Sequence, residues 1–500
     1  MRPGTLLRLA LAGTRTDGAR VALTALSAAL ATLAGLAALT VLAVAKPPGD
    51  AWTESEQYTN ALLREPGLRP GVAFALLLLC VPVLGLAGQC ARLGAPGRDR
   101  RLAALRLAGA TPGQVTWLAV AETGVASLLG TVTGLAVFAV GRWLLHRPDA
   151  AGRLPLPTDV HPAPLAVAAV VVGLPLVAAL VGALLLRRVT TTPFGVVRRV
   201  RTRAPWPWPG VLILAALGIF AAIRPIGLWY ERRDVVMPDS IVPLLLVLGG
   251  LTAMIGVVSG TGWISYTTGR MLHRHGRGPA ALLAARRLTA DPWAGSRTFA
   301  ALLAALIFGA GAAGLRAAFQ AEAELARRTG GGLSDPDFYL GAMDLVNLAV
   351  VVAVVIAGGG LLVAVVEGIT SRRRAYAAQV ATGVPRATIG RSLLWASLAP
   401  AVPAIGLALT VGYLLVAGLI PAPRGGGFEQ TVCDAGPQPC DPNGGGARTE
   451  WVPKVTVTPD VPWEQLAWFA AGGLAAVLLT VLAGLLLLRS ATSVEELRVT

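Results

Sequence analysis

The stretch RDRRLAALRLAGATPGQVTWLAVAE, residues 98–122, decides the fold of this chain. Its basic first half suits a short helix that ends at Gly109, because glycine readily adopts the left-handed conformation that terminates helices. Thr111 is then placed as an N-cap, Pro112 as the first helical residue and Gln114 as the reciprocal cap, which together form a T-x-x-Q capping box. We therefore predict a rigid corner, followed directly by a helix that enters a long apolar run.

The composition indicates an all-α protein with many membrane spans. Of the 500 residues, 54% are hydrophobic and only 14% are charged, which leaves many apolar runs that are too long for a water-facing surface. A net charge of +16 would suggest a nucleic-acid partner in a soluble chain. In a membrane chain the distribution of arginine among the loops matters more, and no nucleic-acid partner is expected.

The hydropathy pattern predicts ten spans and their orientation. After an interfacial helix over residues 1–20, the runs lie at about 21–45, 70–91, 115–140, 163–186, 210–230, 240–262, 298–316, 343–367, 389–420 and 463–488. Most of the 43 basic residues lie in loops on the same side as the N-terminus, and most of the 27 acidic residues lie on the other side. The positive-inside rule then predicts a plasma-membrane protein with both termini in the cytoplasm.

Two parts of the chain repeat each other. Residues 98–115 align without gaps with a later segment in which Gly383 takes the place of Gly109, and an upstream match pairs Arg20 with Arg297. Because two spans separate the copies, we expect parallel four-helix repeats. The predicted units are an interfacial helix (1–20), a first repeat (21–200), a central two-helix hairpin (201–265), a basic linker with an interfacial helix (266–297) and a second repeat (298–500) with an outer loop (421–462).

The corner motif resembles the FtsX-like permeases of ABC transporters, in the mechanotransmission class that includes MacB-type proteins. The residues that fit this pattern as they stand are Leu105, Arg106, Gly109, Ala110, Thr111, Gln114, Val115 and Glu122. The second copy keeps Arg374 and Gly383 but has Val384, Pro385 and Thr388 at the capping positions. Large outer domains that such proteins carry are missing, so the resemblance implies the transmission machinery and leaves the substrate open.

What the resemblance implies is a permease subunit driven by an ATPase in another chain. No P-loop surrounds Lys46 or Lys454, so we expect no enzyme activity and no cofactor here, with ATP and Mg²⁺ held by an ATP-binding partner in two copies. The expected coupling residues are Arg98, Arg100, Arg101, Arg106, Gly109, Ala110, Thr111 and Gln114 in the first corner, and Arg372, Arg373, Arg374 and Gly383 in the second. The alternative is that these arginines only fix topology and bind anionic membrane lipid.

Two acidic residues lie in or at the ends of spans. Glu122 is about two turns into the third run, and we expect it to pair with an arginine of the corner. A proton or substrate path is the alternative. Glu367, at the end of the eighth run, is expected to pair in the same way with an arginine among residues 372–374. Small-residue pairs, Gly130 with Gly134 and Gly256 with Gly260, predict close helix packing within the chain.

Cys433 and Cys440 lie in the outer loop, where oxidation is possible. A disulfide is predicted between them, with two free thiols as the alternative. No histidine is near, so no metal site is expected. The loop also contains VTVTPDVPW, residues 455–463, which suggests a small strand pair and a surface for an unknown outer partner.

Two other functions remain open at this point. The chain could be a signalling or scaffold protein that an ATPase drives to regulate a cell-envelope enzyme or a sensor kinase. It could also be a secondary transporter, although that function would need more ionisable groups within the spans than the sequence provides.

Overall fold

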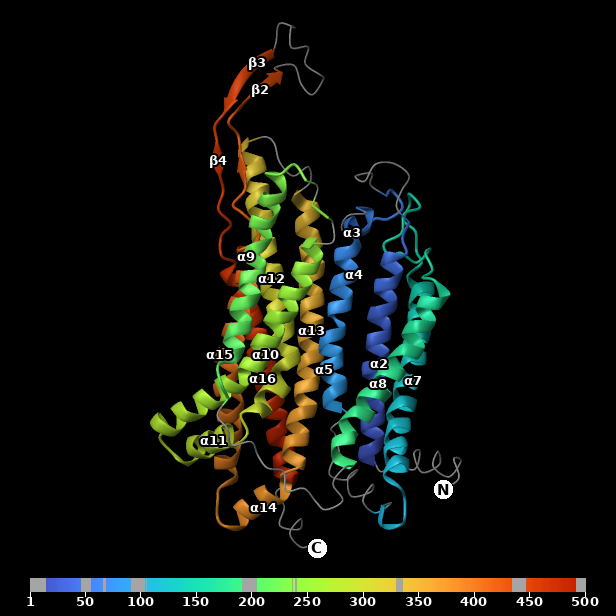
Figure 1. Ribbon diagram of the computed structural model, residues 1–500, viewed down its shortest axis with the longest axis vertical. Helices are drawn as coiled ribbons and strands as arrows, with labels where there is room; N and C mark the ends of the chain where they lie inside the picture. The colour runs from blue at the N-terminus through green and yellow to red at the C-terminus, as the bar shows by residue number, and fades with distance from the viewer. Residues whose placement is uncertain are drawn as a thin grey trace.

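The computed structural model describes residues 15–45, 55–65, 69–90, 104, 106–190, 205–235, 237–238, 241–329, 336–433 and 447–491. These residues form a bundle of long helices with a narrow β-hairpin at one end (Figure 1). The helices are α2 (Arg15–Leu42), α3 (Ala61–Arg64), α4 (Arg69–Leu78), α5 (Cys80–Cys90), α7 (Pro112–Leu145), α8 (Pro164–Thr190), α9 (Trp208–Glu231), α10 (Ile241–His275), α11 (Pro279–Ala290), α12 (Trp293–Thr329), α13 (Pro336–Thr370), α14 (Arg373–Ala381), α15 (Arg386–Ala417) and α16 (Trp463–Ala491).

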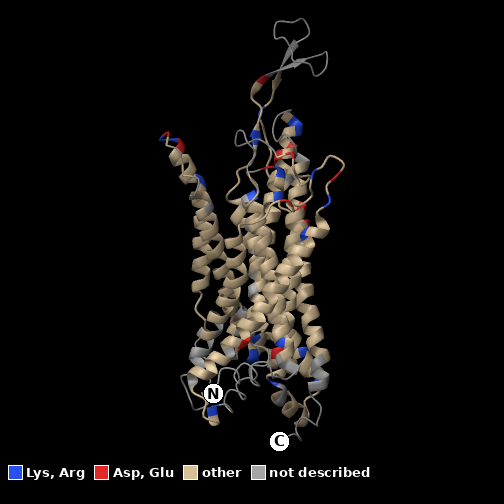
Figure 2. Cartoon of the chain, turned by 90° about the vertical axis from the view of Figure 1, so that its right-hand side faces the viewer, with Lys and Arg blue, Asp and Glu red and all other residues tan. Residues whose placement is uncertain are grey.

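Within the described residues, 8 helices are long and apolar enough to cross a membrane: α2, α7, α9, α10, α12, α13, α15 and α16. The other two predicted spans are helical as well. The run 70–91 consists of α4 and α5, which are separated at Leu79, and the run 163–186 lies within α8. Described charged side chains gather at the two ends of the bundle and leave a wide uncharged band between them (Figure 2), as a bilayer requires.

The first helix begins earlier than the sequence suggested. Residues 1–14 of the expected interfacial helix lie outside the described residues, and residues 15–20 belong to α2 itself. The reason is that Arg20 is buried inside the bundle, so this turn is part of the spanning helix. The helix α2 begins, and α16 ends, at one end of the bundle, which we call the corner end (Figure 1). The opposite end is the hairpin end.

Corresponding helices of the two sequence repeats have corresponding neighbours. In the first repeat α7 packs against α2 and α8, and in the second α15 packs against α12 and α16. The two groups meet where α5 lies against α12 and α13, with Gly85 beside Ala301 and Gly360 beside Leu86. The central hairpin α9–α10 packs against α12 and α15, and therefore covers the second repeat.

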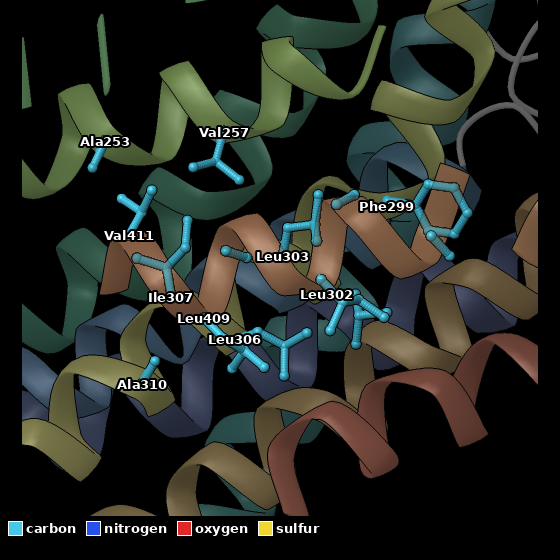
Figure 3. Close-up of a cluster of buried hydrophobic side chains, with 14 of the residues drawn as sticks. Ala253, Val257, Phe299, Leu302, Leu303, Leu306, Ile307, Ala310, Leu409 and Val411 are labelled. Atoms are coloured by element: carbon cyan, nitrogen blue, oxygen red, sulfur yellow. The ribbon is translucent and has the colours of Figure 1, made fainter. Parts of the chain in front are cut away.

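The largest buried cluster lies where α10, α12 and α15 meet. Figure 3 shows Ala253 and Val257 of α10 facing a row of α12 side chains that runs from Phe299 to Ala310, with Leu409 and Val411 contributed by α15. Burial of this kind locks the central hairpin and the second repeat together by close packing, which is the main attraction between helices inside a membrane.

Four short strands form the projection at the hairpin end. Strand β2 (Phe428–Cys433) pairs antiparallel with β3 (Ala447–Val452), and β1 (Arg424–Gly425) pairs with β4 (Val455–Thr456). Of the residues 455–463, where a strand pair was expected, only Val455 and Thr456 form a strand, which is β4. The longer antiparallel pair, β2 with β3, comes earlier in the sequence. Gly425 rests on Leu325 of α12, and the next two residues, Gly426 and Gly427, have φ of 81° and 82°. The ladder is therefore rooted on α12 through a glycine bend.

A small cap closes the first repeat at the hairpin end. Tyr58 is fully buried, and its hydroxyl donates a hydrogen bond to Asp159 Oδ1 at 3.1 Å. Buried Arg69 donates from Nε to the Leu63 carbonyl at 2.8 Å and from Nη1 to the Ala45 carbonyl at 2.8 Å. Tyr58 thus joins the loop after α2 to the loop after α7, and Arg69 joins the start of α4 to α3 and to the segment just after α2. The loops of this repeat therefore form one packed layer.

Candidate coupling site

The first corner has the predicted geometry. Thr111 is extended, with φ −70° and ψ 154°, and α7 begins at Pro112. The Gln114 N–H donates to Thr111 Oγ1 at 3.4 Å, and the Thr111 N–H donates to Gln114 Oε1 at 3.1 Å. Gly109 has φ +91°, and its N–H donates to the Arg106 carbonyl at 3.0 Å. The capping box and the left-handed glycine are both confirmed, so the start of α7 is fixed by local interactions.

The second corner has the same glycine but a different helix start. Gly383 has φ +92°, and its N–H donates to the Val380 carbonyl at 3.0 Å, while the Val384 N–H donates to the Gln379 carbonyl at 3.0 Å. This pair of bonds is a Schellman motif. The N-cap of α15 is Pro385, which makes no side-chain hydrogen bond. The predicted loss of the capping residues is therefore visible as an uncapped helix.

Packing holds the second corner instead. Tyr376 of α14 is buried with Ile369, Ile389 and Leu393, which come from the end of α13 and the start of α15. Arg287 of α11 donates from Nη1 to the Tyr376 hydroxyl at 2.6 Å, and burial lowers the pKa of this arginine. The second corner is thus attached to α11 and to two spans.

The expected docking arginines are only partly described. Arg106 is half-buried and Arg372 is exposed, and Ala110 lies between Gly109 and the cap. Arg98, Arg100 and Arg101 lie outside the described residues, and for Arg373 and Arg374 the structure describes the helix α14 but not the side chains. Their role as a charged dock stays a prediction.

Leu107 is a candidate contact that the sequence did not single out. It lies two residues before Gly109, and 91% of its surface is exposed. In the second corner the equivalent position is Ala381, which is also exposed. The sequence feature that could have identified Leu107 is a large aliphatic residue in the last turn before a helix-ending glycine. At that position the short helix has no neighbouring helix among the described residues against which to bury the side chain. An apolar side chain at the tip of a corner suits contact with a partner.

The expected partner of Glu122 was wrong. Its Oε1 accepts a hydrogen bond from Nη2 of Arg20, and the two side chains are only 10% and 8% exposed. Glu122 lies ten residues after Pro112, which is about 15 Å along the helix, and α2 packs beside this part of α7. The partner is thus an arginine of α2 at the depth of Glu122 rather than one at the start of α7. In the second repeat Ala396 takes the place of Glu122, so the pair occurs only in the first.

Glycines bring α2 and α7 into backbone contact next to this ion pair. A Cβ atom on Gly130 would lie 2.1 Å from the Ala25 carbonyl oxygen, and one on Gly134 would lie 2.8 Å from that of Ala29. The close packing predicted for this glycine pair is confirmed. In the second predicted pair, Gly256 lies close to Ile213 of α9, where a Cβ would be 2.9 Å from Cγ1, while Gly260 makes only an ordinary contact with Pro209, at 3.6 Å.

Two predicted pairings are not tested by the described residues. Glu367 is half-buried in the last turns of α13, and its pairing with residues 372–374 stays a prediction. Cys433 ends β2, while Cys440 lies outside the described residues, so the disulfide between them also stays a prediction. Cys80 and Cys90 are free thiols within the first repeat.

A bundle in which the described residues include 8 helices long and apolar enough to cross a membrane defines a polytopic membrane protein. A family model, the FtsX-like permease C-terminal domain, matches residues 71–194 and 347–495, which is more than half of the chain. The chain therefore belongs to the FtsX-like permease family. Each matched region contains one of the corners, and the unmatched stretch between them contains the central hairpin. No curated protein matches the chain. Family membership indicates a membrane subunit of an ABC transporter, a class that generally works with an ATPase partner.

Proposed function

We propose that this chain is the transmembrane subunit of a MacB-type ABC transporter, in which ATP hydrolysis by a separate subunit drives export or mechanical work on the outer side. The observation that carries this proposal is the pair of left-handed glycines, Gly109 and Gly383, at one end of the bundle. Each ends a short helical segment and is followed within three residues by a spanning helix, α7 or α15. A push on either corner would be delivered directly to a span.

The length of α7 makes it suitable for carrying such a push. It is one uninterrupted helix of 34 residues, which corresponds to about 50 Å from the corner to the hairpin end. The ion pair and the glycine contacts bind α7 to α2 along the way, so the two helices would move together. The helix α15 has 32 residues and is similarly embedded against α12.

The proposed topology has ten spans, with the corner end and both termini in the cytoplasm. The excess of arginine in the loops on that side supports this orientation. ATP and Mg²⁺ would then be held by an ATP-binding partner, with one copy at each corner. Leu107 would supply an apolar contact, and the corner arginines would pair with acidic groups of the partner.

Coupling through the corners can be tested with isoleucine substitutions. A β-branched residue at φ near +90° is strained by about 1–2 kcal/mol, so Gly109→Ile should distort the first corner. The matched control is Gly113→Ile, which lies in the first turn of α7 with no atom within 4 Å of a new Cβ. The chain would be reconstituted with an ATP-binding subunit that copurifies with it, and stimulation of ATP hydrolysis would be measured.

We expect Gly109→Ile to abolish stimulation while Gly113→Ile keeps it, with both variants inserted normally. Gly383→Ile should have a smaller effect, because the second corner is held by packing as well as by its glycine. Survival of stimulation in Gly109→Ile would show that the corner is not the dock. If one permease chain binds one ATP-binding subunit at each corner, two ATP-binding subunits should copurify with one permease. A stable permease dimer that binds the same two subunits would contradict it.

The β-hairpin favours a second function. Its ladder extends beyond the helices and is rooted on α12 through Gly425 and Leu325, so a movement of α12 would displace a surface outside the membrane. A scaffold or signalling protein that regulates an envelope enzyme or sensor kinase would use such a surface. Deletion of residues 428–452 should then abolish signalling and leave transport intact. A secondary transporter has less support, since Glu122 is paired with Arg20.

A further inference from the structure

A basic pocket lies beside the second corner. Its volume is about 540 Å³, and it is an open pocket bordered by the end of α10, the turn into α11 and the start of α15. The lining residues are Met271, Leu272, His275, Gly276, Arg277, Gly278, Pro279, Ala280, Ala281, Thr388, Arg391 and Trp395. Arg277 and Arg391 are among them, and none of the residues that line the pocket is acidic.

Two guanidinium groups and a helix start face this space. Arg277 comes from the turn before α11, and Arg391 comes from the second turn of α15. Both are exposed, and neither forms an ion pair with a described residue. Gly278 caps α11 without a side-chain hydrogen bond, so the backbone N–H groups of Ala280 and Ala281, which line the pocket, have no intrahelical acceptor. Cationic side chains and free N–H groups together favour a phosphate.

The other wall of the pocket is apolar and faces the membrane region. Trp395 lies one turn beyond Arg391 on the same face of α15, and 51% of its surface is exposed. Met271, which is 63% exposed, lies opposite on α10. Both α10 and α15 are candidate spans, and the pocket lies where each reaches the corner end. Tryptophan beside arginine at the end of a span is typical of the headgroup level of a bilayer.

We propose that this pocket binds an anionic phospholipid, with its phosphate between Arg277 and Arg391 and its acyl chains along Met271 and Trp395. The bound lipid would link the α10–α11 turn to the first turns of α15, directly after the second corner. The lipid would stabilise the start of α15, which has no side-chain cap of its own.

Lipid retention by the intact chain tests this proposal. The wild type would be purified from nanodiscs of phosphatidylcholine with phosphatidylglycerol, and the retained phosphatidylglycerol would be counted by native mass spectrometry. The test variant carries Arg277→Gln with Arg391→Gln. The matched control carries Arg270→Gln with Arg274→Gln, which removes two charges from the same end of α10 but outside the pocket.

The test variant should bind phosphatidylglycerol roughly 30-fold more weakly, since each basic group near a lipid surface contributes a factor of about five. The control arginines lie outside the pocket lining, so they should change the general attraction of anionic lipid to this end of the bundle but leave the tightly retained, pocket-bound phosphatidylglycerol within about fivefold of the wild type, which is the contribution of one basic group. A third variant, Arg277→Lys with Arg391→Lys, keeps the charges and should retain most of the binding. Equal losses in the test and control variants would overturn the proposal.

Two further outcomes would also overturn it. Displacement of the lipid by soluble glycerol phosphate would identify a site for a free anion rather than a lipid. Loss of ATP-binding-subunit attachment in pure phosphatidylcholine, seen in the test variant but not in the control, would identify a protein dock. Because retention is measured without any ATPase, failure here is distinguishable from failure of the proposed transport function.

Discussion

The buried ion pair between Arg20 and Glu122 allows a quantitative prediction about how α2 and α7 are joined. Both side chains are about nine-tenths buried, so removing one partner leaves the other charged group without compensation in an apolar environment. Arg20→Met and Glu122→Gln should each destabilise the protein by about 3–5 kcal/mol. The double variant should lie within about 1 kcal/mol of the wild type, because no unpaired charge remains.

The assay is equilibrium unfolding in mixed micelles, followed by tryptophan fluorescence, for the wild type, both single variants and the double variant. With these values the double-mutant cycle should give a coupling free energy of at least about 5 kcal/mol, because the two single losses add up to at least about 6 kcal/mol and the double variant loses at most about 1 kcal/mol. A matched control cycle uses Arg316 and Asp344, an ion pair of the hairpin end with side chains 24% and 66% exposed. Solvent screening should limit its coupling to about 1 kcal/mol or less.

Additive effects at Arg20 and Glu122 would refute this reasoning. They would mean that the two side chains act independently, and that the contact does not hold α2 against α7. The proposed transmission of movement from α7 to α2 would then rest on the glycine contacts alone.

Three other predictions test single features. Gly130→Ala should destabilise the protein by about 1–3 kcal/mol in the same unfolding assay, because the new Cβ would meet the Ala25 carbonyl, whereas Gly141→Ala, with open space around it, should stabilise α7 by about 0.5–1 kcal/mol. Thr111→Ala should cost about 1 kcal/mol and speed amide hydrogen exchange in the first turn of α7. Burial and the neighbouring carboxylate raise the pKa of Tyr58, so its contribution should be complete below pH of about 10 and be lost at higher pH, a loss that Tyr58→Phe removes from the pH–stability curve.

Local motifs were predictable from the sequence because short-range chemistry determines them. Gly109 and Gly383 have the left-handed conformation that their place after a helix requires, and Thr111 with Gln114 forms the capping box that their spacing specifies. The long helices follow from apolar run length in the same way. Each of these features depends on residues within a few positions of one another.

Long-range partners were not predictable in this way. Glu122 pairs with Arg20, and Tyr376 with Arg287, across 102 and 89 positions of sequence. Which arginine lies at the depth of Glu122 depends on how α2 and α7 are placed along each other, and hydropathy alone does not determine that offset.

The central hairpin makes the two halves of the bundle mechanically different. The α9–α10 pair is packed onto α12 and α15, while α7 has close helix contacts only with α2 and α8 among the described helices. To tilt α15, a force must also shear the large buried cluster that α10 shares with it. To tilt α7 together with α2, the same force must move α2 against α4 and α5, but it does not have to shear that cluster. Equal pushes at the two corners would therefore produce unequal strokes, with the first repeat as the compliant half and the second as the stationary half against which it moves.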